Sequence, residues 1–184
     1  VETRQDFISQ IVACSQAFLR EVSSKEKIKN LLSKALDALK TLVISFDVKN
    51  TTFTVSSQER ELYTSTSLTQ SLTDVFVYMG QTALEADTPI CFFIDEIQYM
   101  KEEELGSLIA ALHRTNQLGY PVMIIGAGLP KIYKMLSDEK TYTERLFRYK
   151  EIGSLNQEQT KKAVVEPAIG FGVKYTEEAI DKIY

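Results

Sequence analysis

Two adjacent carboxylates, Asp95 and Glu96, directly follow a run of apolar residues that begins at Ile90. A continuous apolar run of this length predicts a parallel strand that is buried on both faces. The carboxylates then fall at the carboxyl end of the strand, where open α/β sheets bind their ligands. There, one carboxylate can hold Mg²⁺ through water, and the other can polarise an attacking water molecule. The pair therefore indicates a nucleotide-hydrolysing site, and the alternative is a solvated acidic turn after a buried strand.

The second half of such a site is a phosphate-binding loop, Gly-x-x-x-x-Gly-Lys-Ser/Thr, whose backbone N–H groups surround the phosphates. None of the eight glycines in the sequence is followed by lysine, so the sequence does not contain this loop. The chain begins at Val1 rather than at methionine, and the residues up to Tyr184 continue a helical pattern. We therefore expect either a fragment that begins after the phosphate-binding loop or a relative that has lost the loop.

Two glycines, Gly126 and Gly128, lie between a predicted strand and a predicted helix, as they would in a dinucleotide-binding fingerprint. Lys131 stands where the third glycine of Gly-x-Gly-x-x-Gly would be. A tight turn is therefore the preferred explanation for these glycines, and dinucleotide binding is the weaker alternative.

The composition excludes several other kinds of site. The single histidine, His113, is expected on a helix surface or at a helix cap, so neither a His-rich metal site nor a triad that uses several histidines is available. Cys14 and Cys91 are expected to be small core residues without a disulfide, which favours the reducing cytoplasm. The net charge of −4 gives no electrostatic reason to expect nucleic-acid binding by this segment. The sequence contains neither an apolar run of about 20 residues nor a signal-peptide pattern, so no membrane association is expected.

The periodicity of apolar residues predicts the elements that position the carboxylates. Amphipathic helices are expected over residues 5–22, 25–40, 67–86 and 101–118, strands over 90–94 and 122–125, and one or two helices within 130–147. Two β-rich stretches at 41–48 and 51–56 predict a hairpin, residues 57–67 a loop, and residues 150–152 a short strand. Asn156 and Thr176 are expected to cap two further helices. The order strand, helix, strand, helix predicts right-handed crossovers and a parallel sheet.

Four segments occur together in a recognisable order. They are Ile-Asp-Glu-Ile-Gln at 94–98, the strand that leads into Gly-Ala-Gly-Leu-Pro at 122–130, Thr-Tyr-Thr-Glu-Arg-Leu-Phe at 141–147, and Ala-Val-Val-Glu-Pro-Ala at 163–168. Over residues 66–184 or so, this set resembles bacterial and archaeal-type AAA+ ATPases related to the origin-recognition and initiator clade, with Asp95 and Glu96 as the Walker B pair.

The resemblance implies a three-layer, P-loop NTPase-like α/β fold, in which helices flank a parallel sheet. Residues 1–154 would be the AAA+ core, which would lack its N-terminal Walker A segment. Within this core, residues 1 to about 65 would form a helical and hairpin insert. Residues 155–184 would be the truncated start of a helical lid domain.

The resemblance also implies roles for individual residues. Asp95 would coordinate Mg²⁺ through water, and Glu96 would position the hydrolytic water. Arg145 would be an arginine finger, supplied to the site of a neighbouring subunit. Alternatively, Arg145 could pair with Glu144 or cap the C-terminus of a helix. Arg148 is a weaker candidate for the arginine finger.

Other positions depart from the family pattern or leave alternatives open. The polar sensor-1 residue would be expected near Gly126 or Ala127, and neither of these has a side chain that could contact a γ-phosphate. This departure counts against ordinary nucleotide sensing. Gln98 and Tyr99 could orient Glu96 or contact a partner, although packing at the entry to a helix is the preferred explanation for both.

Two functions remain in view, and a doubly wound domain of another family is a third, weaker alternative. The first is an ATPase that couples hydrolysis of Mg-ATP to a change in conformation or assembly, with self-association through the arginine finger. In this case a DNA or protein client would bind regions outside this chain, and the fragment alone would not be competent. The alternative is a degenerate or switch-type nucleotide-binding module that serves as a scaffold for protein or DNA.

Overall fold

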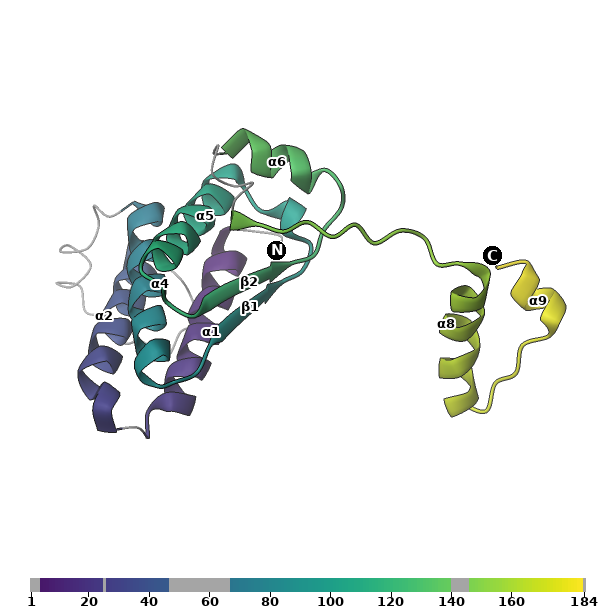
Figure 1. Cartoon of the computed structure of the whole chain (residues 1–184), viewed down its shortest axis with the longest axis horizontal. Coiled ribbons are helices and arrows are strands. Elements are labelled where there is room, and N and C mark those ends of the chain that lie inside the picture. Colours follow the sequence, from purple (N-terminus) through teal and green to yellow (C-terminus); the bar gives the residue numbers. More distant parts are fainter. Residues whose placement is uncertain (1–3, 25, 47–66, 140–145, 184) are drawn as a thin grey trace. The chain divides into compact units, whose positions relative to one another are not determined.

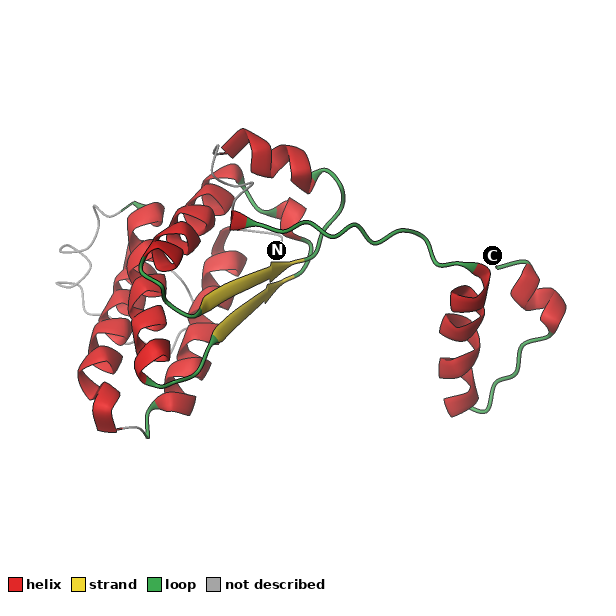
Figure 2. Cartoon of the chain, in the orientation of Figure 1, coloured by secondary structure: helices red, strands yellow, loops and turns green. Residues whose placement is uncertain are grey.

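The computed structural model describes residues 4–24, 26–46, 67–139 and 146–183 (Figure 1). The chain divides into two compact units, residues 1–147 and residues 148–184. The first unit contains helices and a small sheet, whereas the described part of the second unit contains helices and loops (Figure 2). The division precedes the boundary between core and lid that the sequence predicts at 154/155.

The helices of the first unit form where the apolar periodicity predicts them. They are α1 (Arg4–Val22), α2 (Lys29–Ser45), α4 (Leu68–Glu85), α5 (Glu102–Gln117) and α6 (Ile132–Glu139), with a short 3₁₀ turn at Glu26–Ile28 before α2. Ser67 caps α4, because its Oγ accepts the Gln70 N–H at 3.2 Å and so satisfies one donor of the first turn.

The hairpin predicted over 41–56 is wrong in its first part, because residues 41–45 continue α2. Leu42 and Val43 extend the buried stripe of this helix, with exposed fractions of 0% and 4%. The Thr41 hydroxyl donates to the Asp37 carbonyl one turn earlier at 2.9 Å, so it is satisfied within the helix. Packing of the apolar face therefore prevails over the β propensity of these residues. The rest of the predicted hairpin and most of the loop that follows it lie outside the described residues.

The two strands, β1 (Ile90–Ile94) and β2 (Val122–Gly126), pair in parallel, as predicted. The register runs from Ile90 opposite Val122 to Ile94 opposite Gly126, so the carboxyl ends of both strands lie at the same edge. Helix α5 provides the crossover between the strands, and a 3₁₀ turn, Ile97–Tyr99, separates β1 from α5. This arrangement brings the residues after β1 next to those after β2.

The expectation that β1 is buried on both faces is wrong for the described part of the chain. One face contributes Ile90, Phe92 and Ile124 to the core, each at most 9% exposed. On the other face Phe93 is 77% exposed and Met123 is 55% exposed. Among the described residues, helices cover only one side of these strands, and the opposite side is open in Figure 2. A strand that is covered on both faces needs a continuous apolar run. The same run also occurs here, where the described residues cover only one face, so the run alone does not reveal how many faces are buried.

The covered face is held against α4 and α5. The rings of Phe76 in α4 and Phe92 in β1 stack with their centroids 5.0 Å apart. Gly80 allows α4 to approach the loop before β2, because a Cβ at this position would lie 2.8 Å from the Tyr120 Cβ. Close packing against α4 therefore holds the middle of β1 and the beginning of β2 in place.

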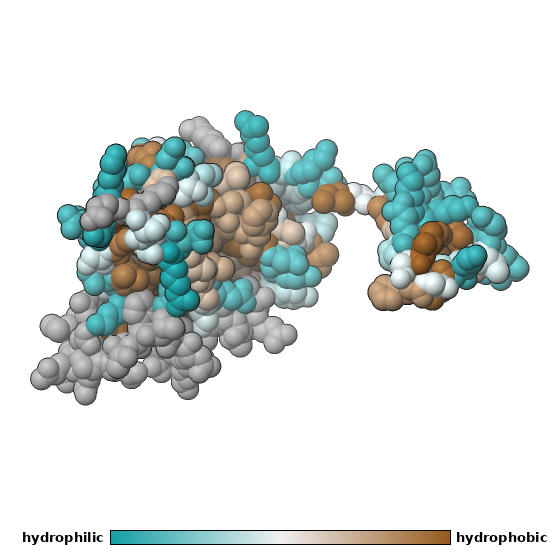
Figure 3. All heavy atoms as spheres, turned by 90° about the horizontal axis from the view of Figure 1, so that it is seen from below, coloured by the Kyte–Doolittle hydropathy of each residue, from teal (hydrophilic) through white to brown (hydrophobic). Residues whose placement is uncertain are grey.

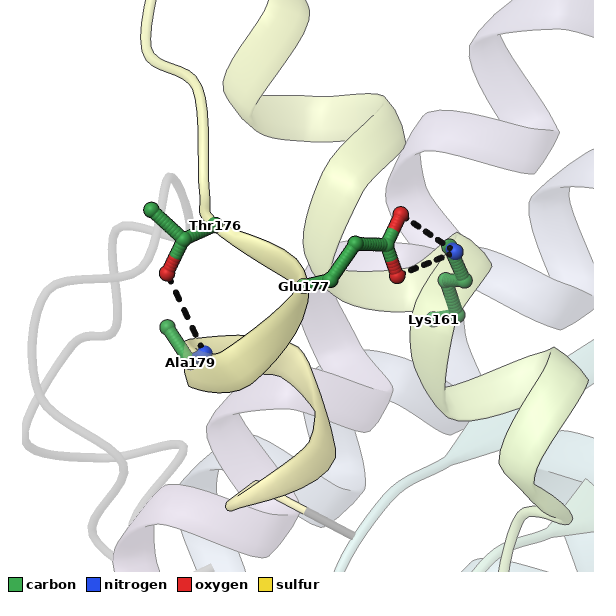
Figure 4. A network of polar contacts seen from close by, with 4 residues as sticks. All are labelled: Lys161, Thr176, Glu177 and Ala179. Carbon is green, nitrogen blue, oxygen red and sulfur yellow. Dashed lines mark hydrogen bonds and ion pairs between the residues drawn. The ribbon is translucent and has the colours of Figure 1, made fainter.

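The described part of the second unit consists of α8 (Gln157–Gly170) and α9 (Glu177–Asp181). Asn156 caps α8 as predicted, since its Oδ1 accepts the Gln159 N–H at 2.9 Å. Thr176 caps α9 in the same way through the Ala179 N–H, and Lys161 joins the helices by an ion pair with Glu177 at 2.9 Å (Figure 4). The strand predicted at 150–152 is wrong, because these residues are irregular.

Both units carry apolar surface among polar side chains (Figure 3). No helix among the described residues is long and apolar enough to cross a membrane. The described fold is an α/β arrangement, mostly helical, with a small parallel sheet of two strands. Such a fold is compatible with the predicted class, and the three-layer AAA+ arrangement stays a prediction.

Candidate functional site

The carboxylates that the sequence singles out, Asp95 and Glu96, lie directly after β1, and both are exposed. The Asp95 Oδ1 accepts the Glu96 N–H at 2.9 Å. Glu96 has a φ of 54°, in the left-handed region. For a residue with a Cβ this conformation costs roughly 1–2 kcal/mol. Such an outlier at the end of a strand motivates a functional hypothesis, because strained backbone is concentrated at binding and catalytic sites.

The turn after β1 is bonded to the loop after β2. The Ala127 N–H donates to the Ile94 carbonyl at 2.8 Å, and the Ile97 N–H donates back to the Ala127 carbonyl at 3.0 Å. These two bonds continue the strand pairing beyond the last sheet residue. As a result, the carboxylates and the loop at 127–131 form one connected surface at the carboxyl edge of the sheet.

Gln98 connects this loop to one of the carboxylates. Its side chain is buried, with 3% exposed, and its Nε2 donates to the Glu96 Oε2. Its Oε1 accepts the Leu129 N–H at 3.1 Å. Gln98 therefore both packs at the start of the 3₁₀ turn and orients Glu96, two roles that the sequence left as alternatives. Tyr99 points away from the core, with 61% exposed.

The close approach at Gln98 explains one of the two glycines. A Cβ on Gly128 would lie 2.5 Å from the Gln98 Oε1, a distance that real Cβ atoms do not adopt. A Cβ on either Gly126 or Gly128 would also approach the Ile97 side chain to 3.0 Å, so contact with Gln98 distinguishes the two positions. The packing of the loop against Gln98 therefore favours glycine at position 128, because a larger residue would displace the Gln98 amide. This explanation holds whether or not a dinucleotide binds.

An open groove of about 660 Å³ runs beside β1 and ends at the carboxylates. Its walls are apolar, and they come mainly from α1 and β1, including Phe7, Ile11, Phe18 and Phe93. Asp95 and Glu96 line its polar end. The sequence indicated the carboxylates and assigned the α1 residues to the core. It contained no signal that α1 would lie beside this strand, since no local pattern links segments so far apart.

The carboxylates suit one mode of Mg²⁺ binding. Among the residues that the structure describes, no group of three or more His, Cys, Asp or Glu side chains could form a complete metal cage. Mg²⁺ is usually bound by one or two carboxylates together with water and phosphate oxygens, and this mode needs no such cage. The exposed Asp95, at the mouth of the groove, fits this mode.

Of the remaining predicted residues, two lie in the described parts of the chain and one lies outside them. Arg145, the predicted arginine finger, lies outside the described residues. Arg148, its weaker competitor, is exposed in the second unit. His113 is half-buried within α5.

Both cysteines are free, but the expectation that both are core residues is wrong for Cys14, which is exposed. Cys14 lies on the flank of α1, beside the buried stripe that includes Ile11 and Ser15. Cys91 is half-buried. Both side chains line the groove beside β1.

Comparison of the sequence with protein-family models and curated proteins, and of the fold with solved structures, finds no match to this chain. The resemblance to AAA+ ATPases therefore depends on the four sequence segments and their order.

Proposed function

We propose that this chain provides the Walker B half of a Mg-ATP-hydrolysing site of the AAA+ type. The observation that carries the proposal is the Asp95-Glu96 pair at the carboxyl end of β1, next to the end of the parallel strand β2. Ligands of open α/β sheets bind at this edge. The groove that ends at the two carboxylates gives the site a concave surface.

The two carboxylates have separate roles in this proposal. Asp95 binds the hydrated cation, and Glu96, held by Gln98, orients and polarises the attacking water. When bound, Mg²⁺ would neutralise negative charge on the phosphate oxygens. Arg145 would complete the site of a neighbouring subunit, and another segment would supply the phosphate-binding loop that this sequence lacks.

A second candidate is a switch-type or degenerate module that acts as an interaction scaffold. Two observations favour it. The loop after β2 begins with Ala127, whose side chain cannot hydrogen-bond a γ-phosphate. In addition, Phe93 and Met123 leave one face of the sheet apolar and exposed, as in a binding surface.

The test is to change Glu96 to Gln in the natural protein that contains this sequence. Glu96→Gln keeps the size of the side chain but removes the carboxylate, so ATP binding should be retained and hydrolysis should slow by at least about tenfold. Glu102→Gln, an exposed change in the first turn of α5, is the control and should leave turnover unchanged. Unchanged turnover in Glu96→Gln would remove Glu96 from its catalytic role.

Calorimetry with Mg-ATP separates the two candidates. We expect this chain alone to bind ATP weakly or not at all, and a longer form that includes a phosphate-binding loop to bind it. If the natural full-length protein also fails to bind ATP, the scaffold becomes the better proposal.

A further inference from the structure

We propose that Gln98 is a positioning residue that couples the loop after β2 to the Glu96 carboxylate. The coupling is argued from the two hydrogen bonds of the Gln98 amide and from the close approach of Gly128 to it. Its effect on hydrolysis rests on the function proposed above.

The first step concerns the orientation of the Gln98 amide. One end donates to the Glu96 Oε2, and the other end accepts from the Leu129 N–H at 3.1 Å. Rotating the amide by half a turn would place its NH₂ group against the Leu129 N–H and its oxygen against the carboxylate. Both of these contacts would be repulsive, so the two partners together select a single orientation. With only 3% of the side chain exposed, water offers the amide no alternative partner.

The second step concerns the loop. Gly128 packs so closely that a Cβ would lie 2.5 Å from the Gln98 Oε1. The Leu129 carbonyl accepts the Ile132 N–H at 2.9 Å, which joins the loop to the first residue of α6. A displacement at the start of α6 therefore moves Leu129, and Leu129 cannot move far without rotating or releasing the Gln98 amide.

The third step concerns Glu96. Its side chain is exposed, and its carboxylate accepts a hydrogen bond from the buried Gln98 amide. The bond from Gln98 fixes where this carboxylate points. Because a misplacement of about 1 Å in a catalytic group can lower a rate by about 100-fold, this bond decides whether Glu96 is ready to act. The loop needs no polar side chain for this coupling, since it acts through the backbone N–H of Leu129.

The coupling can be tested without nucleotide by amide hydrogen exchange and NMR. Gln98→Met removes both hydrogen bonds at a similar side-chain length, so exchange of the Leu129 N–H should accelerate by about tenfold. Glu96→Ala should shift the Leu129 amide resonance in the wild-type chain and leave it unchanged in the Gln98→Met background. An equal shift in both backgrounds would overturn the proposal.

A second pair of variants perturbs the contact from the side of the loop. Gly128→Ala should disturb the Gln98 amide, with faster exchange at Leu129 and a shift of the Gln98 side-chain NH₂ resonances. Gly126→Ala is the matched control, because both added methyl groups would approach the Ile97 side chain to 3.0 Å, whereas the one at position 128 would also clash with the Gln98 Oε1. If Gln98→Met fails to fold, Gly128→Ala alone decides the outcome, and equal effects of the two glycine variants would contradict the proposal.

Kinetics of the natural protein then measure the consequence for hydrolysis. Gln98→Met and Gly128→Ala should lower kcat by about tenfold and leave the KM for ATP within about twofold, because they misplace Glu96 without removing a ligand contact. Gln98→Glu keeps the acceptor for Leu129 but cannot donate to Glu96, so kcat should fall here too. Unchanged kcat in all three variants would overturn the positioning role. If the wild-type protein shows no hydrolysis, the proposed function fails, and the exchange experiments still decide the coupling.

Discussion

Glu104, in the first turn of α5, shows how a single residue can depart from its sequence pattern. It is the third of three consecutive glutamates, a residue type that is favoured in the first turn of a helix and is usually solvated there. In the structure Glu104 is 1% exposed, and its Oε2 accepts the Lys101 N–H at 3.0 Å. Its position on the helix, next to the buried Leu105 and one turn before Leu108, turns it toward the core. The hydrogen bond compensates in part for that burial by satisfying an otherwise unpaired donor.

Asp74 in α4 allows a prediction of pH dependence. Partial burial raises the pKa of this carboxyl, although the hydrogen bond from Gln70 opposes the shift. The charged form is therefore disfavoured in the folded state, and stability should increase as pH falls through the folded pKa toward the unfolded value. Asp74→Asn should raise the free energy of unfolding at pH 7 by less than about 0.5 kcal/mol, because the site is largely solvated.

Urea denaturation at several pH values measures this effect. The difference between Asp74→Asn and the wild-type chain should disappear below about pH 3, where the carboxyl is neutral in both the folded and the unfolded state. Asp37→Asn, on the neighbouring helix α2, is the matched control. A loss of stability at pH 7 in Asp74→Asn would show that the charged carboxylate is favourable in the folded state.

At the scale of elements, α2 provides the clearest disagreement with local propensity. Its final turns contain Thr41 and Val43, which favour strands, yet the helix ends only at Ser45. Ala35, Leu39 and Leu42 lie at helical spacing, and each is 0% exposed. This continuity of the buried stripe extends the helix, because most of the stability of a helix in a protein comes from packing.

The extension of α2 can be tested with two substitutions in that helix. Leu42→Ala removes a fully buried side chain and should lower the free energy of unfolding by about 2–5 kcal/mol. Leu36→Ala, at a position that is 40% exposed, should lower it by less than about 1 kcal/mol. Chemical denaturation of both variants provides the measurement. Equal, small effects would indicate that the last turns of α2 are not packed against the core.

At the scale of the whole molecule, the two units differ in how much they bury. The first unit contains a core that joins α1, α2, α4, α5 and both strands. In the described part of the second unit, α8 has no buried residue, and Ile180 in α9 is 7% exposed. Each helix is capped at its own N-terminus, and the Lys161–Glu177 ion pair joins the two helices. Exposed ion pairs of this kind contribute little to stability.

Amide hydrogen exchange read by mass spectrometry should reveal this difference. We expect the amides of α4 and α5 to exchange slowest, because they open only with the first unit as a whole. The amides of α8 should exchange by local opening, at least about 100-fold faster. Similar protection in α8 and α4 would show that the second unit is stabilised by contacts beyond those within it.

The elements of the site were largely predictable from the sequence. Apolar periodicity identifies α4 and α5, and continuous apolar runs identify both strands. The caps at Asn156 and Thr176 follow from side chains that hydrogen-bond within one turn, whereas the sequence allowed either Ser67 or Thr69 to cap α4. Asp95 and Glu96 were identifiable because the end of a strand is a local feature. Periodicity and capping depend on residues a few positions apart, so sequence alone determines them.

The supporting contacts of the site required the tertiary structure. The bond from Leu129 to Gln98 joins residues 31 positions apart in sequence, and the close approach at Gly128 exists only once both strands have paired. The exposure of Phe93 depends in the same way on which helices cover the sheet. These features follow from the docking of distant segments. The sequence by itself therefore determined where the carboxylates lie along the chain, and only the packed structure decided what holds them.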